Sequence, residues 1–158
     1  MPENNTFFPP TYYIISGGFD PLHEGHIALI NEAVKNSDGV IILLNSDDWL
    51  TRKKGSPFMT FTTRQAVCQS LKGIIEVIAF DDSDNSASDG IRLARTRYPD
   101  IRLVFANGGD RHADNIPETE TCRRYNVELA FGIGGENKAN SSSWILNRWE
   151  QKRKNNDQ

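Results

Sequence analysis

The stretch that decides the fold of this chain is GGFDPLHEGH, residues 17–26. A short apolar run, YYII at 12–15, comes before it, and an amphipathic run, IALINEAV at 27–34, comes after it. This order predicts a β-strand, a glycine turn and the start of a helix. Glycines let the backbone come close to a ligand, and the N-terminus of a helix has unpaired N–H groups that suit a phosphate. We therefore expect residues 17–26 to bind a polyphosphate.

Two of the three histidines of the chain, His23 and His26, lie three residues apart in this stretch. Residues three apart share one face of a helix, so both imidazoles are expected to point the same way. Imidazole N–H donors aimed at a triphosphate would stabilise the charge that builds on its α-phosphate during displacement. The alternatives are two ordinary surface histidines or a zinc pair. A zinc site needs further ligands, and His112 is the only other histidine.

The stretch resembles the signature of the nucleotidyltransferase superfamily, an H-x-G-H core after a G-x-F-D turn, at every motif position. The resemblance implies that His23 and His26 are catalytic and contact the phosphates of a nucleoside triphosphate. It also implies that neighbouring motif residues bind the nucleotide, namely Gly17, Gly18, Phe19, Asp20 and Gly25. Asp20 has an alternative role as the cap of the turn or of the first helix.

The bulk properties of the chain predict one soluble globular domain. It has 158 residues, 25% of them charged and 37% hydrophobic, and we expect a domain over 12–154, a loose arm at 1–11 and a frayed tail at 155–158. The net charge of −3 gives no general attraction to nucleic acid or an anionic membrane, and no apolar run approaches the roughly 20 residues of a membrane span. The N-terminus lacks a basic or apolar signal segment, and Cys68 and Cys122 are expected to be reduced, so we expect a cytoplasmic protein.

Strands and helices are expected to alternate along the chain. The expected strands are 12–16, 39–45, 74–80, 101–106 and 127–131. The expected helices are 22–36, one that opens at Thr62 with Ala66, Val67, Ser70 and Leu71 inward, 87–98, 118–125 and 141–154. The alternation predicts an α/β fold, a Rossmann-like three-layer αβα sandwich with a parallel five-stranded sheet. Ligands of such sheets bind beyond the carboxyl ends of the strands at a switch point, and the polar clusters below all follow strands.

A basic run, RKKG at 52–55, follows the second expected strand. Together with NSD at 45–47 it looks like a stretch of the sugar-phosphate and polyol-phosphate branch, in which a lysine contacts the triphosphate or the acceptor phosphate. The spacing to Gly55 favours Lys54 as the catalytic lysine, with Lys53 as a second phosphate contact, and a solvated basic loop is the alternative. Arg64 matches an arginine of relatives that would bind a phosphate, and an interhelical salt bridge is its alternative.

A glycine-rich cluster, FANGGDR at 105–111, follows the fourth expected strand. It resembles the K-G-G-D or M-G-D-D segment that lines the nucleotide site of relatives. Gly109 would let the backbone approach the base or ribose, Asp110 would accept a hydrogen bond, and Arg111 would contact a phosphate or the acceptor. An ordinary Asn-Gly turn is the alternative.

The serines Ser141, Ser142 and Ser143 stand where relatives carry serines at the N-terminus of a late helix. Hydroxyls and unpaired N–H groups there can bind the β- and γ-phosphates of a nucleotide. Ser141 can also act as the N-cap, and the two roles are compatible. Glycerol-phosphate cytidylyltransferases carry an arginine-bearing segment before these serines, whereas this chain has GENK at 135–138, with Lys138 as the candidate substitute.

From 12 to 145 the order of these clusters is similar to that in cytidylyltransferase-like nucleotidyltransferases, especially glycerol-3-phosphate cytidylyltransferase and the adenylyltransferase domain of heptose-phosphate enzymes. The implied reaction joins a nucleoside triphosphate, CTP or ATP, to a phosphorylated sugar or polyol and releases pyrophosphate. The acceptor phosphate would attack the α-phosphorus directly, so no side chain is needed as a covalent nucleophile. Mg²⁺ is expected mainly on the triphosphate oxygens, without a protein metal cage.

Two other functions stay open on the sequence. One is adenylyl transfer to pantetheine phosphate or a mononucleotide, and the other is a nucleotide-binding module that has lost turnover. We expect no nucleic-acid partner and no membrane partner. The aromatic residues Trp49, Trp144 and Trp149 are candidates for a homodimer contact, and core packing explains them equally well.

Overall fold

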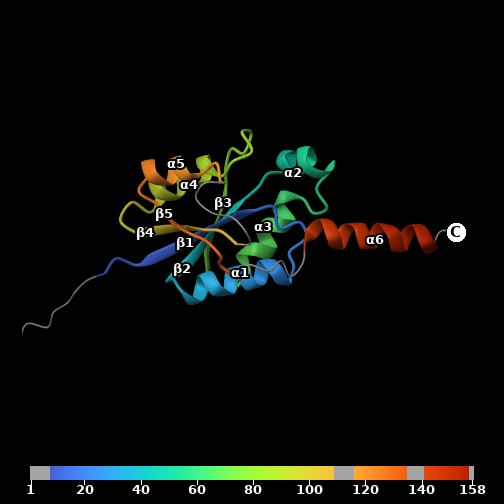
Figure 1. The fold of residues 1–158 in the computed structure, drawn as a ribbon, viewed down its shortest axis with the longest axis horizontal. Helices are drawn as coiled ribbons and strands as arrows, with labels where there is room; N and C mark the ends of the chain where they lie inside the picture. The colour runs from blue at the N-terminus through green and yellow to red at the C-terminus, as the bar shows by residue number, and fades with distance from the viewer. Residues whose placement is uncertain (1–7, 109–115, 135–140, 157–158) are drawn as a thin grey trace, which may run out of the picture.

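The computed structural model describes residues 8–108, 116–134 and 141–156, and its centre is one parallel β-sheet (Figure 1). The strands are β1 (Thr11–Gly17), β2 (Gly39–Leu44), β3 (Ile74–Ala79), β4 (Arg102–Ala106) and β5 (Glu128–Ala130). Their order in the sheet is β3-β2-β1-β4-β5, and all four pairings are parallel. The chain runs outward from β1 to β3 and then continues on the other side of β1. The switch point therefore lies between β1 and β4, where such sheets bind their ligands.

The central strands are buried on both faces because helices cover the sheet from both sides. The helices are α1 (Glu24–Lys35), α2 (Asp47–Lys54), α3 (Phe61–Gln69), α4 (Ser88–Arg97), α5 (Thr119–Arg124) and α6 (Ser142–Asn156). Helices α4 and α5 pack on the face that carries Ile14 and Leu43, and α1 and α3 pack on the face that carries Ile15 and Leu44. Successive strand residues point to opposite faces, so continuous apolar runs are required here. The predicted three-layer α/β sandwich with five parallel strands is confirmed.

Helix α3 differs from the prediction in its start and in its buried face. Thr60 is its N-cap, with its hydroxyl accepting a hydrogen bond from the Thr63 N–H. Of the predicted inward residues, Ala66 and Ser70 are exposed, whereas Arg64 and Cys68 are buried. Leu71 packs against the core as predicted, whereas the prediction for Ala66 and Ser70 is wrong because Arg64 and Cys68 occupy the core-facing positions. An apolar pattern cannot reveal a buried charge whose acceptors come from elsewhere in the fold.

Helix α6 extends away from the sheet and its covering helices (Figure 1). It has no buried residue, and Trp144 and Trp149 are 50% and 56% exposed. Core packing therefore does not explain these two tryptophans. The helix also continues to Asn156, two residues past its expected end. Among the helices that the structure describes, none has the length and apolar character to cross a membrane.

Candidate functional site

The two histidines of the signature build the N-terminus of α1 by capping it reciprocally. His23 is the N-cap, and its Nδ1 accepts a hydrogen bond from the Gly25 N–H at 3.0 Å. The His26 Nδ1 accepts one from the His23 backbone N–H at 3.2 Å. A neutral imidazole whose Nδ1 is an acceptor has its proton on Nε2. Both rings are therefore prepared to donate through Nε2.

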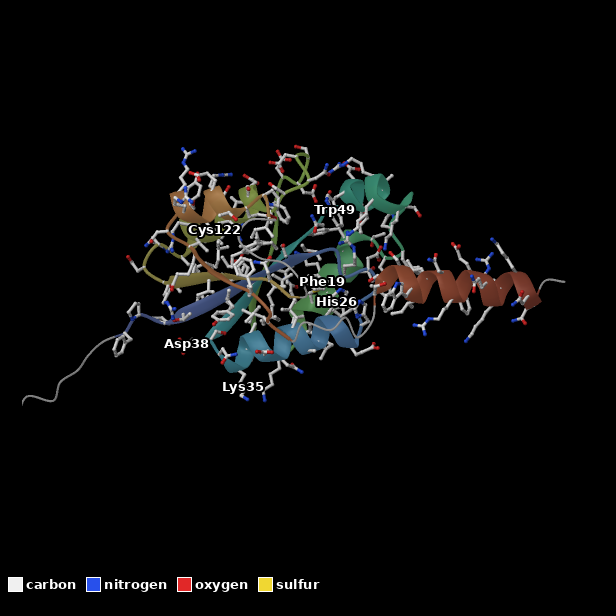
Figure 2. The ribbon with its side chains drawn as sticks, in the orientation of Figure 1. Phe19, His26, Lys35, Asp38, Trp49 and Cys122 are labelled. Atoms are coloured by element: carbon white, nitrogen blue, oxygen red, sulfur yellow. The ribbon has the colours of Figure 1, made fainter. Side chains whose placement is uncertain are left out.

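The two imidazoles lie against each other rather than apart. Their ring centroids are 3.8 Å apart, and their planes are inclined by 24°. The edge of Phe19 supports His26 at a centroid distance of 4.8 Å, and Figure 2 shows these two side chains beside the start of α1. Phe19 itself is buried at 4% exposure. The spacing argument for a shared direction of the two histidines agrees with this arrangement.

The protonation of His26 is controlled by its surroundings. Burial first, and then the neighbouring His23, lower the pKa of His26 to about 4. The ring is therefore neutral near pH 7, and it offers a neutral N–H donor instead of a positive charge. A neutral donor can bind phosphate oxygens without the cost of burying an unpaired cation.

A cavity of about 310 Å³ opens beside His26 at the carboxyl edge of the sheet. Its walls come from the end of β1, from α1 and α2, from the loop before α4, and from the end of β4. Gly17 and Gly18 line it. A Cβ atom on Gly18 would lie 2.9 Å from Leu50 Cδ2, so a side chain there would require Leu50 to move. The cavity lies at the switch point where the fold predicts a ligand.

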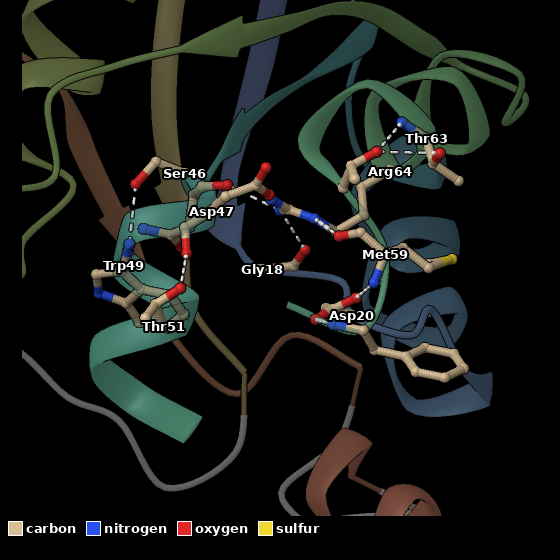
Figure 3. A network of polar contacts seen from close by, with 12 residues as sticks. Gly18, Asp20, Ser46, Asp47, Trp49, Thr51, Met59, Thr63 and Arg64 are labelled. Atoms are coloured by element: carbon tan, nitrogen blue, oxygen red, sulfur yellow. Dashed lines mark hydrogen bonds and ion pairs between the residues drawn. The ribbon is translucent and has the colours of Figure 1, made fainter. Parts of the chain in front are cut away.

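Asp20 is buried below this turn and fixes the loop before α3 (Figure 3). Its carboxylate accepts hydrogen bonds from the N–H groups of Phe58 at 2.7 Å and Met59 at 2.6 Å. It also forms an ion pair with Lys54, whose Nζ lies 2.9 Å from Asp20 Oδ2. Asp20 is therefore not the cap of α1, since His23 has that role, and its carboxylate is committed to protein donors.

The two lysines of the basic run have different surroundings. Lys54 Nζ also donates to the Asp20 carbonyl at 2.6 Å, so its ammonium group is bound to the signature turn. Lys53 lines the cavity, and its Nζ lies 4.6 Å from the centroid of the Trp49 ring. The spacing argument that favoured Lys54 did not find the lysine that faces the cavity. The reason is that the buried Asp20 forms an ion pair with Lys54, which lies one residue after Lys53 in α2.

Arg64 is fully buried and is bound on all sides by protein acceptors (Figure 3). Its Nε donates to the Met59 carbonyl at 2.9 Å, and its Nη1 donates to the carbonyls of Gly18 at 3.0 Å and Asn45 at 2.7 Å. Its Nη2 forms an ion pair with Asp47 at 2.7 Å. The geometry corresponds to the salt-bridge alternative and not to a phosphate contact. Arg64 connects the ends of β1 and β2 to α2.

The start of α6 lies beside the signature turn. The Ser142 hydroxyl donates to the Pro21 carbonyl at 2.8 Å, across 121 positions of the chain. The Ser141 hydroxyl accepts from the Trp144 N–H at 3.0 Å, which is an N-cap contact, and Ser143 is exposed. The N-termini of α1 and α6 are therefore close together.

Several predicted site residues lie outside the part of the chain that the structure describes. They are Gly109, Asp110, Arg111 and Lys138. Gly25 lies within α1, where its N–H is the donor to His23. Over residues 8–108, 116–134 and 141–156, no group of three or more His, Cys, Asp or Glu side chains could hold a metal ion.

The sequence reasoning gave no site role to three of the residues that line the cavity, namely Trp49, Asn107 and Glu118. Trp49 follows the Ser46 cap of α2, where nothing in the local pattern marks it as a wall residue. Asn107 lay within the glycine-rich cluster 105–111 without a role of its own, and Glu118 was expected only as the first residue of a helix. A lone acidic residue at a helix start carries no signal of burial, so only the tertiary structure could identify Glu118.

The chain is similar to one family model and to several known proteins. The family model described as cytidylyltransferase-like matches residues 14–155. A bifunctional protein HldE from Syntrophotalea carbinolica is 30% identical over 89% of this chain and 28% of its own length. Another from Azotobacter vinelandii is 32% identical over 72% of this chain and 23% of its own length. The chain thus spans about a quarter of the length of these relatives.

Two solved structures have a similar fold. One is a lipopolysaccharide core biosynthesis protein from Thermoplasma volcanium, with a TM-score of 0.57 and 20% identity over 77% of this chain and 95% of that one. The other is a putative nicotinate-nucleotide adenylyltransferase from Vibrio parahaemolyticus, with a TM-score of 0.58 and 16% identity over 87% of this chain and 85% of that one. At these identities the likeness establishes the fold alone.

Proposed function

The chain belongs to the cytidylyltransferase-like family, and from that premise we propose that it transfers a nucleoside monophosphate from CTP or ATP to a phosphorylated sugar or polyol. Pyrophosphate is the second product. The observation that carries the proposal is the reciprocal capping of His23 and His26, which directs two Nε2–H donors away from the helix they cap. His26 lines a cavity large enough for a small ligand.

The proposed reaction is a direct displacement at the α-phosphorus. An oxygen of the acceptor phosphate forms the new P–O bond, and the bond to the bridging oxygen breaks, so that pyrophosphate leaves with the electron pair. The imidazole N–H groups donate to the α-phosphate and bridging oxygens, where charge increases in the transition state. Lys53 adds a positive charge from α2. Mg²⁺ would enter on the triphosphate and neutralise its oxygens.

The leaving pyrophosphate is proposed to lie against the starts of α1 and α6. The positive ends of two helix dipoles meet there, and the Ser142–Pro21 hydrogen bond keeps the two starts together. The similarity to the bifunctional HldE proteins and the resemblance to heptose-phosphate adenylyltransferase domains support a sugar phosphate as the acceptor. A homodimer through the exposed tryptophans of α6 stays a prediction.

The test is a pyrophosphate-release assay on the purified protein. Each nucleoside triphosphate is supplied with Mg²⁺ and, in turn, with sugar, polyol and choline phosphates, pantetheine phosphate and a mononucleotide. We expect release with CTP or ATP and a sugar or polyol phosphate. Release with pantetheine phosphate or a mononucleotide would instead identify the alternative adenylyltransferase. Saturable nucleotide binding with no release for any acceptor would identify a binding module.

A further inference from the structure

Glu118 is a buried carboxylate, and one of its oxygens has no partner in the part of the chain that the structure describes. It is 4% exposed, it directly precedes α5, and it lines the cavity. Its Oε1 accepts a hydrogen bond from the Ala87 N–H at 3.3 Å, but its Oε2 has no hydrogen-bond partner among the residues that the structure describes. A buried, unsatisfied carboxylate oxygen lowers stability by an amount comparable to a lost charged hydrogen bond. Such a group points to a ligand that donates a hydrogen bond.

Asn107, which directly follows β4, has a buried donor group where Glu118 has a buried acceptor. It is 5% exposed, and its backbone is fixed because its N–H donates to the Ala130 carbonyl at 2.8 Å and its carbonyl accepts from Ile133 at 3.1 Å. Its Nδ2 is buried with no acceptor within the described part of the chain, and the residue lines the same cavity. Among the described residues, the lining of one cavity therefore contains a donor without an acceptor and an acceptor without a donor.

We propose that Glu118 and Asn107 bind the hydroxyl groups of the acceptor, at the part of that molecule remote from its phosphate. A hydroxyl can donate to the Glu118 carboxylate and accept from the Asn107 amide, which matches the two missing bonds. A phosphate cannot donate when ionised and would be repelled by the carboxylate. The pair therefore selects a neutral polyhydroxylated chain, and this inference rests on the proposed transferase function.

The position of Glu118 relative to the histidines supports this assignment. Helix α1, which carries His23 and His26, covers one face of the sheet, whereas α4 and α5, which flank Glu118 and Ala87, cover the other. In a direct displacement the attacking and leaving oxygens lie on opposite sides of the phosphorus. With the pyrophosphate at the starts of α1 and α6, the acceptor approaches from the α4 and α5 side. Asn85 and Ser86 extend the polar wall on that side.

The test compares Glu118→Gln and Asn107→Ala with the control Glu120→Gln, a change at a 77% exposed side chain of the same helix. Binding is measured by calorimetry with a non-hydrolysable triphosphate analogue present, using a sugar phosphate and phosphocholine, which has no hydroxyl group. We expect the dissociation constant of the sugar phosphate to rise about 10- to 100-fold in both cavity variants. Binding of the triphosphate analogue should change less than about twofold, and the control should match the wild type in both.

A second measurement separates ligand recognition from a structural role. The amide oxygen of Glu118→Gln can still accept from Ala87, while the uncompensated buried charge is removed. We therefore expect the melting temperature of the ligand-free variant to equal or exceed that of the wild type. A lower melting temperature would mean that the free protein already satisfies this carboxylate, and it would overturn the proposal.

The outcomes distinguish this inference from the proposed function. The proposal that Glu118 and Asn107 bind hydroxyl groups is overturned if Glu118→Gln binds the sugar phosphate as tightly as the wild type does. It is also overturned if the wild type binds phosphocholine more tightly than the sugar phosphate. Pyrophosphate release with phosphocholine but not with sugar phosphates would do the same while keeping the transferase activity. Glu118-dependent binding of sugar phosphate without any pyrophosphate release would support the pair and refute the transfer.

Discussion

The His26 Nδ1 accepts the backbone N–H of His23 at 3.2 Å, so the side chain that is proposed to bind phosphate is also part of the helix cap. This contact leaves Nε2 as the nitrogen that carries the proton in the neutral ring. It also fixes the ring beside Phe19, at 4.8 Å between centroids. Stability and the proposed chemistry are therefore coupled at one residue, and the variants below are chosen to separate them.

Replacement of His26 should reduce turnover far more than it reduces stability. We expect His26→Ala to lower kcat by at least about 100-fold, the scale for removing one donor that stabilises transition-state charge. The lost cap contact should reduce the free energy of unfolding by only about 1 kcal/mol. Pyrophosphate release and urea unfolding measure the two effects. Near-normal kcat in a folded variant would refute the role of His26.

The variant His26→Gln provides the matched control for the cap. Glutamine at this third helical position can still accept the N-cap N–H, as in an ordinary capping box. We expect its unfolding free energy to stay close to that of the wild type while kcat falls as in His26→Ala. Recovery of kcat in His26→Gln would show that the cap, and not the imidazole donor, accounts for the loss.

Stability should decrease on acidification because of His26. The folded-state pKa is about 4, below the ordinary value of 6.5, so the unfolded chain binds more protons between these limits. The free energy of unfolding therefore rises with pH across this window, and a change from pH 7 to pH 5 should remove about 2 kcal/mol. Urea unfolding at both pH values measures this change. His26→Gln should lose that part of the pH dependence, and an unchanged slope would contradict the assignment.

The adjacent lysines should separate into one functional and one structural residue. Lys53→Met should lower kcat at least about 10-fold with little change in melting temperature, because Lys53 lines the cavity. Lys54→Met should reduce unfolding free energy by about 1–3 kcal/mol, because it leaves the buried Asp20 without its ion pair. Activity assays and thermal unfolding on the two matched variants test this. The reverse pattern would restore Lys54 as the catalytic candidate.

We expect Arg64 to contribute to the stability of the fold and not to phosphate binding. Arg64→Lys removes the planar fork that reaches Met59, Gly18 and Asn45, and we expect the free energy of unfolding to fall by about 3–5 kcal/mol. The exposed Arg92, which pairs with Asp89 one turn away on α4, provides the control, and Arg92→Lys should change it by less than about 0.5 kcal/mol. Urea unfolding gives both values. A raised acceptor KM with unchanged stability in Arg64→Lys would favour the phosphate contact instead.

Sequence reasoning succeeded for features that depend on one continuous segment and failed where partners come from distant parts of the chain. The apolar runs within 39–45 and 101–106 predicted strands correctly, because residues 39–44 and 103–106 are buried on both faces of the sheet. The family assignment also succeeded, since the signature is one continuous segment. The inner face of α3 was predicted only in part, because Arg64 obtains its acceptors from positions 17, 19 and 46 residues away.

The sequence by itself determined the order of strands and helices, the edge of the sheet where the ligand should bind, and the pairing of His23 with His26. These depend on periodicity and on contacts within one turn of helix. Only the tertiary structure decided that Lys53 rather than Lys54 faces the cavity, that Asp20 and Arg64 support the turn, and that Glu118 is buried in the same cavity. The physical reason is that the free energy of a charged side chain depends on which partners surround it, and those partners come from distant parts of the chain.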